Sequence, residues 1–151
     1  MPRFASKKST KLVDGKNMTG FFVSDFLFKE IEELRLKQRL PERTTLFNGV
    51  FQVPTFTDIM AMAQAQYNAS GRLVGIYPEL KHPSFFNALG FHMEDMFLAE
   101  LTAGGFEAYG PDVANNIKEQ VVPVVVQCFE NATLTYLRSV TTLPLVYLMN
   151  K

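Results

Sequence analysis

The sequence predicts an α/β fold with a parallel sheet, and the order of segments in its second half is the reason. Short apolar runs lie at residues 73–77, 121–129 and 143–149, and each has the length of a strand that is buried on both faces. Segments 91–103 and 131–140 separate these runs and are predicted to be helices. An order of strand, helix, strand, helix, strand is typical of parallel strands joined by right-handed crossovers.

Residues 1–40 are predicted to form a loop followed by one helix. Positions 1–20 mix Lys, Ser, Thr, Gly and Asp without periodicity, so we interpret them as an N-terminal loop segment. The segment that follows has apolar residues near helical spacing, and Ser24 or Asp25 can cap its first turn. Pro41 is expected to end this helix.

Residues 41–71 are predicted to form a loop and a second helix. Asn48-Gly49 is a dipeptide that favours a turn. Thr55, with Asp58 three residues later, has the spacing of a capping box at the start of a helix. Gly71 is expected to end that helix.

Composition excludes several classes of protein. The chain has 15 basic and 15 acidic residues, and a nucleic-acid-binding surface would need a basic excess. No apolar run approaches the length of a membrane span, and the polar, basic N-terminus lacks the apolar core of a secretory signal. Cys128 is the single cysteine, which excludes an internal disulfide and a cysteine-based zinc site. These features do not determine the cellular compartment of the protein.

Glu79 and Lys81 are the candidate binding residues, because they follow directly on the first apolar run. In an extended chain, residues two apart point to the same side, so a carboxylate and an ammonium group would project together. A hard divalent cation prefers carboxylate oxygens, and lysine offers a point charge to a phosphate. A solvated pair of little energetic value at a strand end is the alternative, and spacing alone leaves both interpretations open.

The other polar residues near strand ends receive structural interpretations, and no catalytic residue is assigned. His82 and His92 lie in or beside polar loops, as ordinary surface histidines do. Cys128 lies within an apolar strand, where a buried and inert thiol is expected. Gln127 either faces a ligand or is a buried amide with local partners.

Several stretches resemble the glycerophosphodiester phosphodiesterase family, in the long form found in plants and in secreted bacterial enzymes. They are "NMTGFFVSDFLFKEIEELRLKQRLP" at 17–41, "VFQVPTFTDIMAMA" at 50–63 and "VGIYPELKHP" at 74–83. "VVVQCFE" at 124–130 and "LPLVYLM" at 143–149 continue the same order. The resemblance covers nearly the whole chain, and "YPELK" is its most specific part. The family often has Thr where this chain has Leu27, so capping is expected from the neighbouring polar residues.

The resemblance implies a metal-dependent TIM barrel that hydrolyses glycerophosphodiesters to glycerol 3-phosphate and an alcohol, with Ca²⁺ or Mg²⁺ as the cation. Glu79 matches the metal-binding glutamate of the family, and Lys81 matches the lysine that helps to bind the phosphodiester. The His-Arg pair, the Glu and Asp, and the second histidine of the family motifs do not occur in this sequence. A full barrel needs about 250 residues. Residues 21–151 are therefore expected to form the middle of a barrel, which is inactive as an isolated fragment.

Two alternatives to this interpretation stay open. A non-catalytic remnant would associate with itself or with a partner through open sheet edges, because unpaired edge strands invite pairing. A small α/β module would bind an anion at Glu79 and Lys81.

Overall fold

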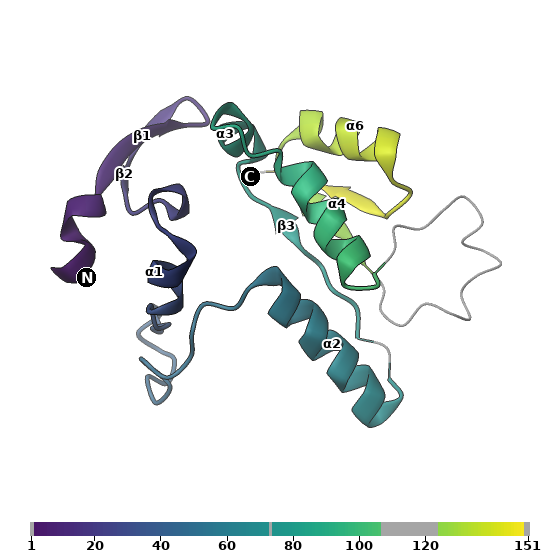
Figure 1. Ribbon diagram of the computed structural model, residues 1–151, viewed down its shortest axis with the longest axis horizontal. Coiled ribbons are helices and arrows are strands. Elements are labelled where there is room, and N and C mark those ends of the chain that lie inside the picture. Colours follow the sequence, from purple (N-terminus) through teal and green to yellow (C-terminus); the bar gives the residue numbers. More distant parts are fainter. Residues whose placement is uncertain (1, 73, 107–123, 150–151) are drawn as a thin grey trace. The chain divides into compact units, whose positions relative to one another are not determined.

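The computed structural model describes residues 2–72, 74–106 and 124–149 (Figure 1). The chain divides into two compact units, Met1–Thr55 and Phe56–Lys151. Within the described ranges, helices accompany a two-stranded sheet and a three-stranded sheet, and no closed barrel is formed. The α/β class is confirmed, while the TIM barrel stays a prediction.

A β-hairpin lies within residues 1–20, so the prediction of a loop there is wrong. After a 3-10 helix at Pro2–Lys7, strand β1 (Ser9–Val13) pairs antiparallel with β2 (Lys16–Gly20). Asp14 and Gly15 form the two-residue connection with φ values of 49° and 75°. Two consecutive positive φ angles are the requirement of a type I′ turn, and Asp-Gly is among the dipeptides that favour it.

The helix predicted to reach Pro41 is much shorter in the structure. A 3-10 helix at Val23–Asp25 precedes α1, which spans Phe28–Glu32. Leu27 is the N-cap, and its backbone N–H donates to Glu30 Oε2 at 2.8 Å. Asp25 does not cap this helix, because its carboxylate accepts hydrogen bonds from the Ser9 hydroxyl at 2.9 Å and from Lys11. The expectation of a cap at Ser24 or Asp25 is therefore wrong.

Hydrogen bonds between distant residues explain why the helix does not continue. The Leu36 N–H donates to Phe51 O at 2.8 Å, and the Gly49 N–H donates to Leu36 O at 2.9 Å. The Gln38 N–H donates to Asn48 Oδ1 at 2.7 Å. These bonds pair residues 36–38 with 48–51 and use donors that a helix would need. Gly49 has φ = 79°, which confirms the predicted turn.

Acid is expected to destabilise the hairpin and α1. Hydrogen bonds from the Lys11 ammonium and the Ser9 hydroxyl lower the pKa of Asp25 below its ordinary value of 3.8. The Lys7 ammonium and the Leu27 N–H lower the pKa of Glu30 below 4.5. A carboxyl with a lowered pKa in the folded state stabilises the fold above its unfolded pKa, and this contribution disappears as pH falls through the folded value.

The measurement is the urea midpoint of the hairpin resonances by NMR between pH 6 and pH 2. The midpoint should be constant at the upper end and fall below about pH 4. The double variant Asp25→Asn, Glu30→Gln should show a low midpoint with a much weaker pH dependence. An equally steep fall in that variant would assign the acid effect to other groups.

In the described residues, the second unit contains seven elements. They are α2 (Phe56–Ser70), β3 (Glu79–Leu80), α3 (Pro83–Ala88), α4 (Met93–Ala103), β4 (Val126–Cys128), α6 (Asn131–Val140) and β5 (Leu145–Tyr147). The predicted helices α2, α4 and α6 are confirmed, and Gly71 follows α2 with φ = 66°. Glu130 is the N-cap of α6. Pro83 occupies the first turn of α3, where its missing N–H costs nothing.

The three-stranded sheet is parallel, in the order β3-β4-β5. Its second and third strands lie within the predicted runs 121–129 and 143–149; residues 121–123 are outside the described residues. The first strand was predicted at Leu73–Tyr77, where the described residues contribute an isolated bridge between Ile76 and Val124. Strand β3 begins two residues later, so Glu79 lies inside the strand instead of after it.

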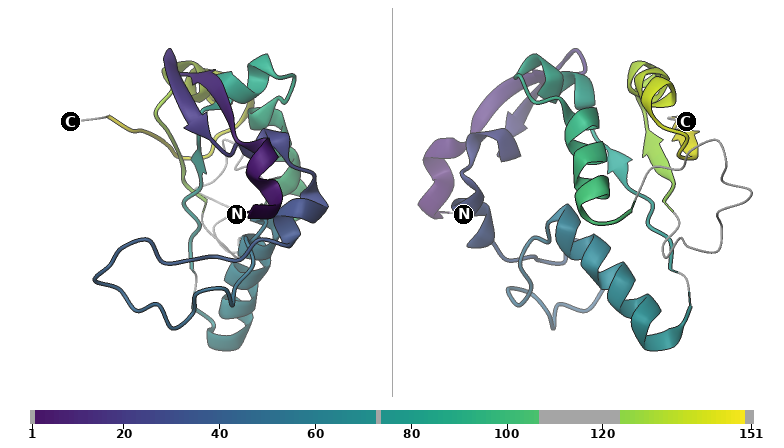
Figure 2. Two further views of the ribbon diagram at one scale, coloured as in Figure 1. Left: turned by 90° about the vertical axis from the view of Figure 1, so that its left-hand side faces the viewer. Right: turned by 45° about the vertical axis from the view of Figure 1, so that its right-hand side comes forward.

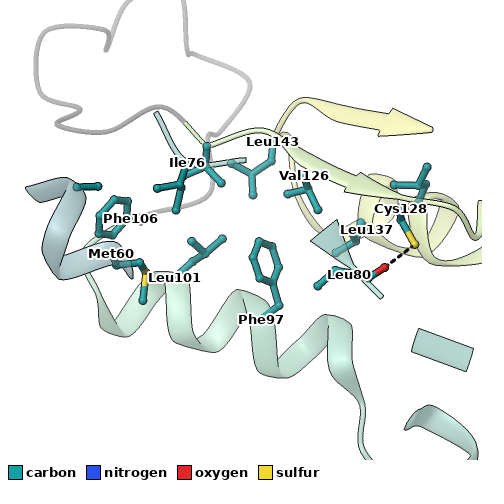
Figure 3. Close-up of a cluster of buried hydrophobic side chains, with 13 residues drawn as sticks. Met60, Ile76, Leu80, Phe97, Leu101, Phe106, Val126, Cys128, Leu137 and Leu143 are labelled. Carbon is teal, nitrogen blue, oxygen red and sulfur yellow. Dashed lines mark hydrogen bonds between the residues drawn. The ribbon is translucent and has the colours of Figure 1, made fainter. Parts of the chain in front are cut away.

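One face of this sheet is covered, so the expectation of strands buried on both faces is wrong. Side chains from the sheet and from α2, α4 and α6 form one apolar cluster (Figure 3). Its buried members are Met60, Ala63, Ile76, Leu80, Phe97, Leu101, Phe106, Val124, Val126, Cys128, Leu134, Leu137 and Leu143. On the opposite face, called the open face below, Tyr77 and Phe129 are 51% and 42% exposed.

Candidate functional site

Glu79 and Lys81 both lie away from the core of the second unit. Leu80, between them, is only 6% exposed and packs into the apolar cluster. Because side chains alternate along an extended chain, Glu79 and Lys81 are directed to the open face, and both are exposed. The backbone then turns at His82, which has φ = 54° and is the N-cap of α3. The structure thus leaves the carboxylate and the ammonium group accessible to a ligand.

Gln127 is the neighbour of Glu79 in the sheet. The two residues are in register between β3 and β4, and Val146 of β5 is next in the same row. Residues in register point to the same face, and adjacent strands are about 4.8 Å apart. Gln127 Nε2 donates to the Tyr77 carbonyl at 3.4 Å. The open face therefore carries a carboxylate and an amide side by side, with Lys81 just beyond them.

No ion pair joins Glu79 to Lys81 in the described part of the chain. The ion pairs found there are Arg3–Glu33, Lys7–Glu30 and Lys11–Asp25, which all lie in the first unit. Both side chains are exposed and not paired with each other, so the alternative of solvated residues at a strand end stays open beside a binding role. Both charges lie where they can meet an external group.

A hard cation would find suitable oxygen donors here, but too few of them. Glu79 offers a carboxylate and Gln127 an amide oxygen, which are ligand types that Ca²⁺ and Mg²⁺ accept. Ca²⁺ takes six to eight oxygens, and the described residues contain no group of three or more His, Cys, Asp or Glu side chains suited to a metal ion. The residues fit such an ion in chemistry and could supply part of its coordination.

Cys128 lies on the core side of the sheet and takes no part in this arrangement. Its side chain is fully buried, the thiol donates to Leu80 O at 3.2 Å, and the sulfur accepts from the Glu130 N–H at 3.3 Å. Burial raises the pKa of the Cys128 thiol, and the nearby carboxylates of Glu130, Glu94 and Glu79 raise it further. A protonated, buried thiol agrees with the interpretation of an inert cysteine.

A pocket of about 320 Å³ lies among the helices of the second unit and does not include Glu79 or Lys81. Its lining residues are Ser84, Asn87, His92, Glu94, Asp95, Glu130, Ala132, Thr133 and Tyr136. Glu94 is 5% exposed and accepts from Asn87 Nδ2 at 3.0 Å and from the Thr133 hydroxyl at 2.7 Å. With three carboxylates in its wall, the pocket repels a phosphodiester, and its hydrogen bonds join α3, α4 and α6.

A parallel sheet with a carboxylate, an amide and a lysine at one open face defines the class of the second unit: an α/β domain with a row of polar side chains on its open face. Comparison with known proteins supplies the family. The chain is 37% identical over 152 residues to glycerophosphodiester phosphodiesterase GDPD6 of Arabidopsis thaliana, covering 97% of this chain and 39% of that protein. It is 30% identical over 98 residues to a glycerophosphodiester phosphodiesterase of Haemophilus influenzae, covering 58% of this chain and 27% of that protein.

The chain belongs to the glycerophosphodiester phosphodiesterase family, as its resemblance predicted. No family model matches it. The chain spans well under half the length of either curated relative.

Proposed function

We propose that this chain forms one wall of the active site of a metal-dependent glycerophosphodiester phosphodiesterase. The observation that carries the proposal is the row on the open face, where Glu79 and Gln127 are in register and Lys81 follows. The names of the relatives supply the reaction class: hydrolysis of a glycerophosphodiester to glycerol 3-phosphate and an alcohol.

Each charged side chain has a distinct role in this proposal. Glu79 provides a carboxylate ligand to a divalent cation, Ca²⁺ or Mg²⁺, which when bound would neutralise charge on the phosphodiester. Lys81 places its ammonium group against a non-bridging phosphate oxygen, as a point charge on a flexible stem. The exposure of both side chains allows a small phosphodiester to reach them from solvent.

The 151-residue chain alone is expected not to turn over glycerophosphocholine, with Ca²⁺ or Mg²⁺ present. It carries neither the His-Arg pair nor the Glu and Asp of the family motifs, and a general acid–base pair and further ligands are needed for hydrolysis. The measurement is choline release by the purified chain. Turnover of about 1 s⁻¹ or more, in the ordinary range of enzymes, would overturn this expectation.

A chimera tests whether this chain can supply its part of a working active site. The matched segment of the Arabidopsis relative is replaced by this chain, which aligns over 97% of its length. We expect the chimera to release choline from glycerophosphocholine at a measurable fraction of the parent rate. A folded chimera that binds metal but releases no choline, beside an active parent, would contradict the proposal.

The second candidate is a non-catalytic remnant that associates through the sheet, and the observation in its favour is the topology. In the described residues, β3 and β5 each pair on one side only. Exposed parallel edges invite pairing with another chain. Light scattering distinguishes the two: an obligate assembly together with an inactive chimera supports the remnant, and a monomer with an active chimera supports the enzyme wall.

A further inference from the structure

A long segment of the first unit is exposed at every residue and is rich in large apolar side chains. All residues from Pro41 to Pro54 are exposed. Leu46, Phe47, Val50 and Phe51 are 76%, 53%, 57% and 54% exposed. Soluble proteins rarely leave a contiguous apolar patch uncovered unless it binds something.

This segment is an ordered loop with a hydrogen-bonded base. Residues 36–38 pair with 48–51 through the three hydrogen bonds described above, and Gln52 Nε2 donates to Glu32 O at 2.8 Å. The rings of Phe47 and Phe51 pack with their centroids 5.6 Å apart. Figure 2 (left) shows the segment as a loop that extends away from α1. Leu46 and Phe47 lie beyond the hydrogen-bonded base, whereas Val50 and Phe51 belong to it, and the two rings connect these parts.

Basic side chains surround the apolar ones. Residues 35–54 contain Arg35, Lys37, Arg39 and Arg43, all exposed, and a single acidic residue, Glu42. This local excess of three positive charges stands in a chain whose formal net charge is zero. Of the three acids in and beside α1, Glu30 and Glu33 are ion-paired with Lys7 and Arg3, while the exposed Glu32 offsets one of the three charges and leaves a net excess of two. The hydrogen-bonded base joins the arm that contains Lys37 to the arm that contains Val50 and Phe51.

We propose that residues 35–54, the basic–apolar loop, dock this protein on the surface of an anionic phospholipid bilayer. Aromatic and aliphatic side chains can enter the boundary between headgroups and acyl chains, while arginine and lysine meet the lipid phosphates. Arginine and aromatic side chains are also enriched in protein interfaces, so the test below includes association with a second copy of the chain as an outcome. No helix in the described part of the chain is long and apolar enough to cross a bilayer.

Vesicle co-sedimentation of the 151-residue chain tests this docking. The probes are vesicles of pure phosphatidylcholine and vesicles with about 30% phosphatidylserine. We expect binding to the anionic vesicles that weakens with added salt, and little binding to the neutral ones. Reversal of two charges in Arg39→Glu, Arg43→Glu should weaken binding more than twentyfold, since each basic side chain contributes about fivefold to partitioning.

Apolar variants separate insertion from electrostatic attraction alone. Phe47→Ser, Phe51→Ser should weaken binding about tenfold or more, because both rings leave the interface. The matched control is Leu12→Ser, which removes an apolar side chain that is 65% exposed in the hairpin of the same unit. NMR spectra of the variants report whether the hairpin stays folded.

Several outcomes would overturn the docking proposal. Equal binding to neutral and anionic vesicles would show that binding does not depend on anionic lipid. A loss of binding in Leu12→Ser as large as in Phe47→Ser, Phe51→Ser would show that the basic–apolar loop is not the specific contact. Absence of vesicle binding, together with a dimer that Phe47→Ser, Phe51→Ser dissolves in light scattering, would assign the loop to a second copy of this chain instead.

Discussion

Glu79→Gln in the chimera is expected to lower kcat/KM for glycerophosphocholine by about 100- to 1000-fold, the range found when one stabilising group for developing charge is removed. The substitution keeps the size of the side chain and removes its negative charge. Glu79 is exposed on the open face and makes no ion pair within the described residues, so its loss should leave the fold intact. The effect then reports its interaction with a bound group.

Metal dependence makes this prediction specific to the proposed role. If Glu79 is a ligand, the Glu79→Gln chimera should need a higher concentration of Ca²⁺ or Mg²⁺ for half of its own maximal rate. Glu42→Gln is the matched control, because Glu42 is an exposed glutamate of the first unit, and it should change neither rate nor metal requirement. A loss of rate in Glu79→Gln with an unchanged metal requirement would contradict a ligand role.

Lys81→Met in the same chimera distinguishes the role of Lys81 from that of Glu79. Removal of the ammonium group should raise KM for the phosphodiester, because a ground-state charge contact is lost, and should leave the metal requirement unchanged. Identical kinetic changes in Glu79→Gln and Lys81→Met would argue that both act on the same step.

Elements that depend on interactions between residues close in sequence could be predicted from short sequence patterns. Helix α2 has its capping pattern and its terminal Gly71 in the sequence, and α4 ends at Ala103, where the predicted segment 91–103 also ends. The hairpin also had a local signal, Asp14-Gly15. Its strands lack an apolar alternation, because the half-buried side of β1 carries Ser9 and Lys11, Leu12 lies on its exposed side, and polar residues dominate β2. The flanking residues therefore gave no support to the turn.

Contacts between distant residues account for the main errors. The helix after Asp25 was overextended because Leu36 and Gln38 bond to residues 48–51 instead of continuing the helix. Prediction of the candidate site was limited in the same way by contacts between residues far apart in sequence. Glu79 and Lys81 are two residues apart and could be recognised together, whereas the place of Gln127 beside Glu79 depends on the register of two strands far apart in sequence.

The second large effect is expected from Leu137→Ala, which should lower the free energy of unfolding of the second unit by about 2–5 kcal/mol. Leu137 lies in α6, is fully buried and belongs to the apolar cluster that covers one face of the sheet. Its truncation removes apolar contacts and leaves a cavity between α6 and the strands. The measurement is urea denaturation followed by NMR resonances of α6 and β4.

Val140→Ala is the matched control on the same helix, because Val140 is 49% exposed and outside the cluster. It should change the free energy of unfolding by no more than about 0.5 kcal/mol. Equal small effects of the two substitutions would mean that α6 is not packed on the sheet in solution. The register that places Gln127 beside Glu79 would then lose its support, since short parallel strands with one open face depend on the helices that cover the other face.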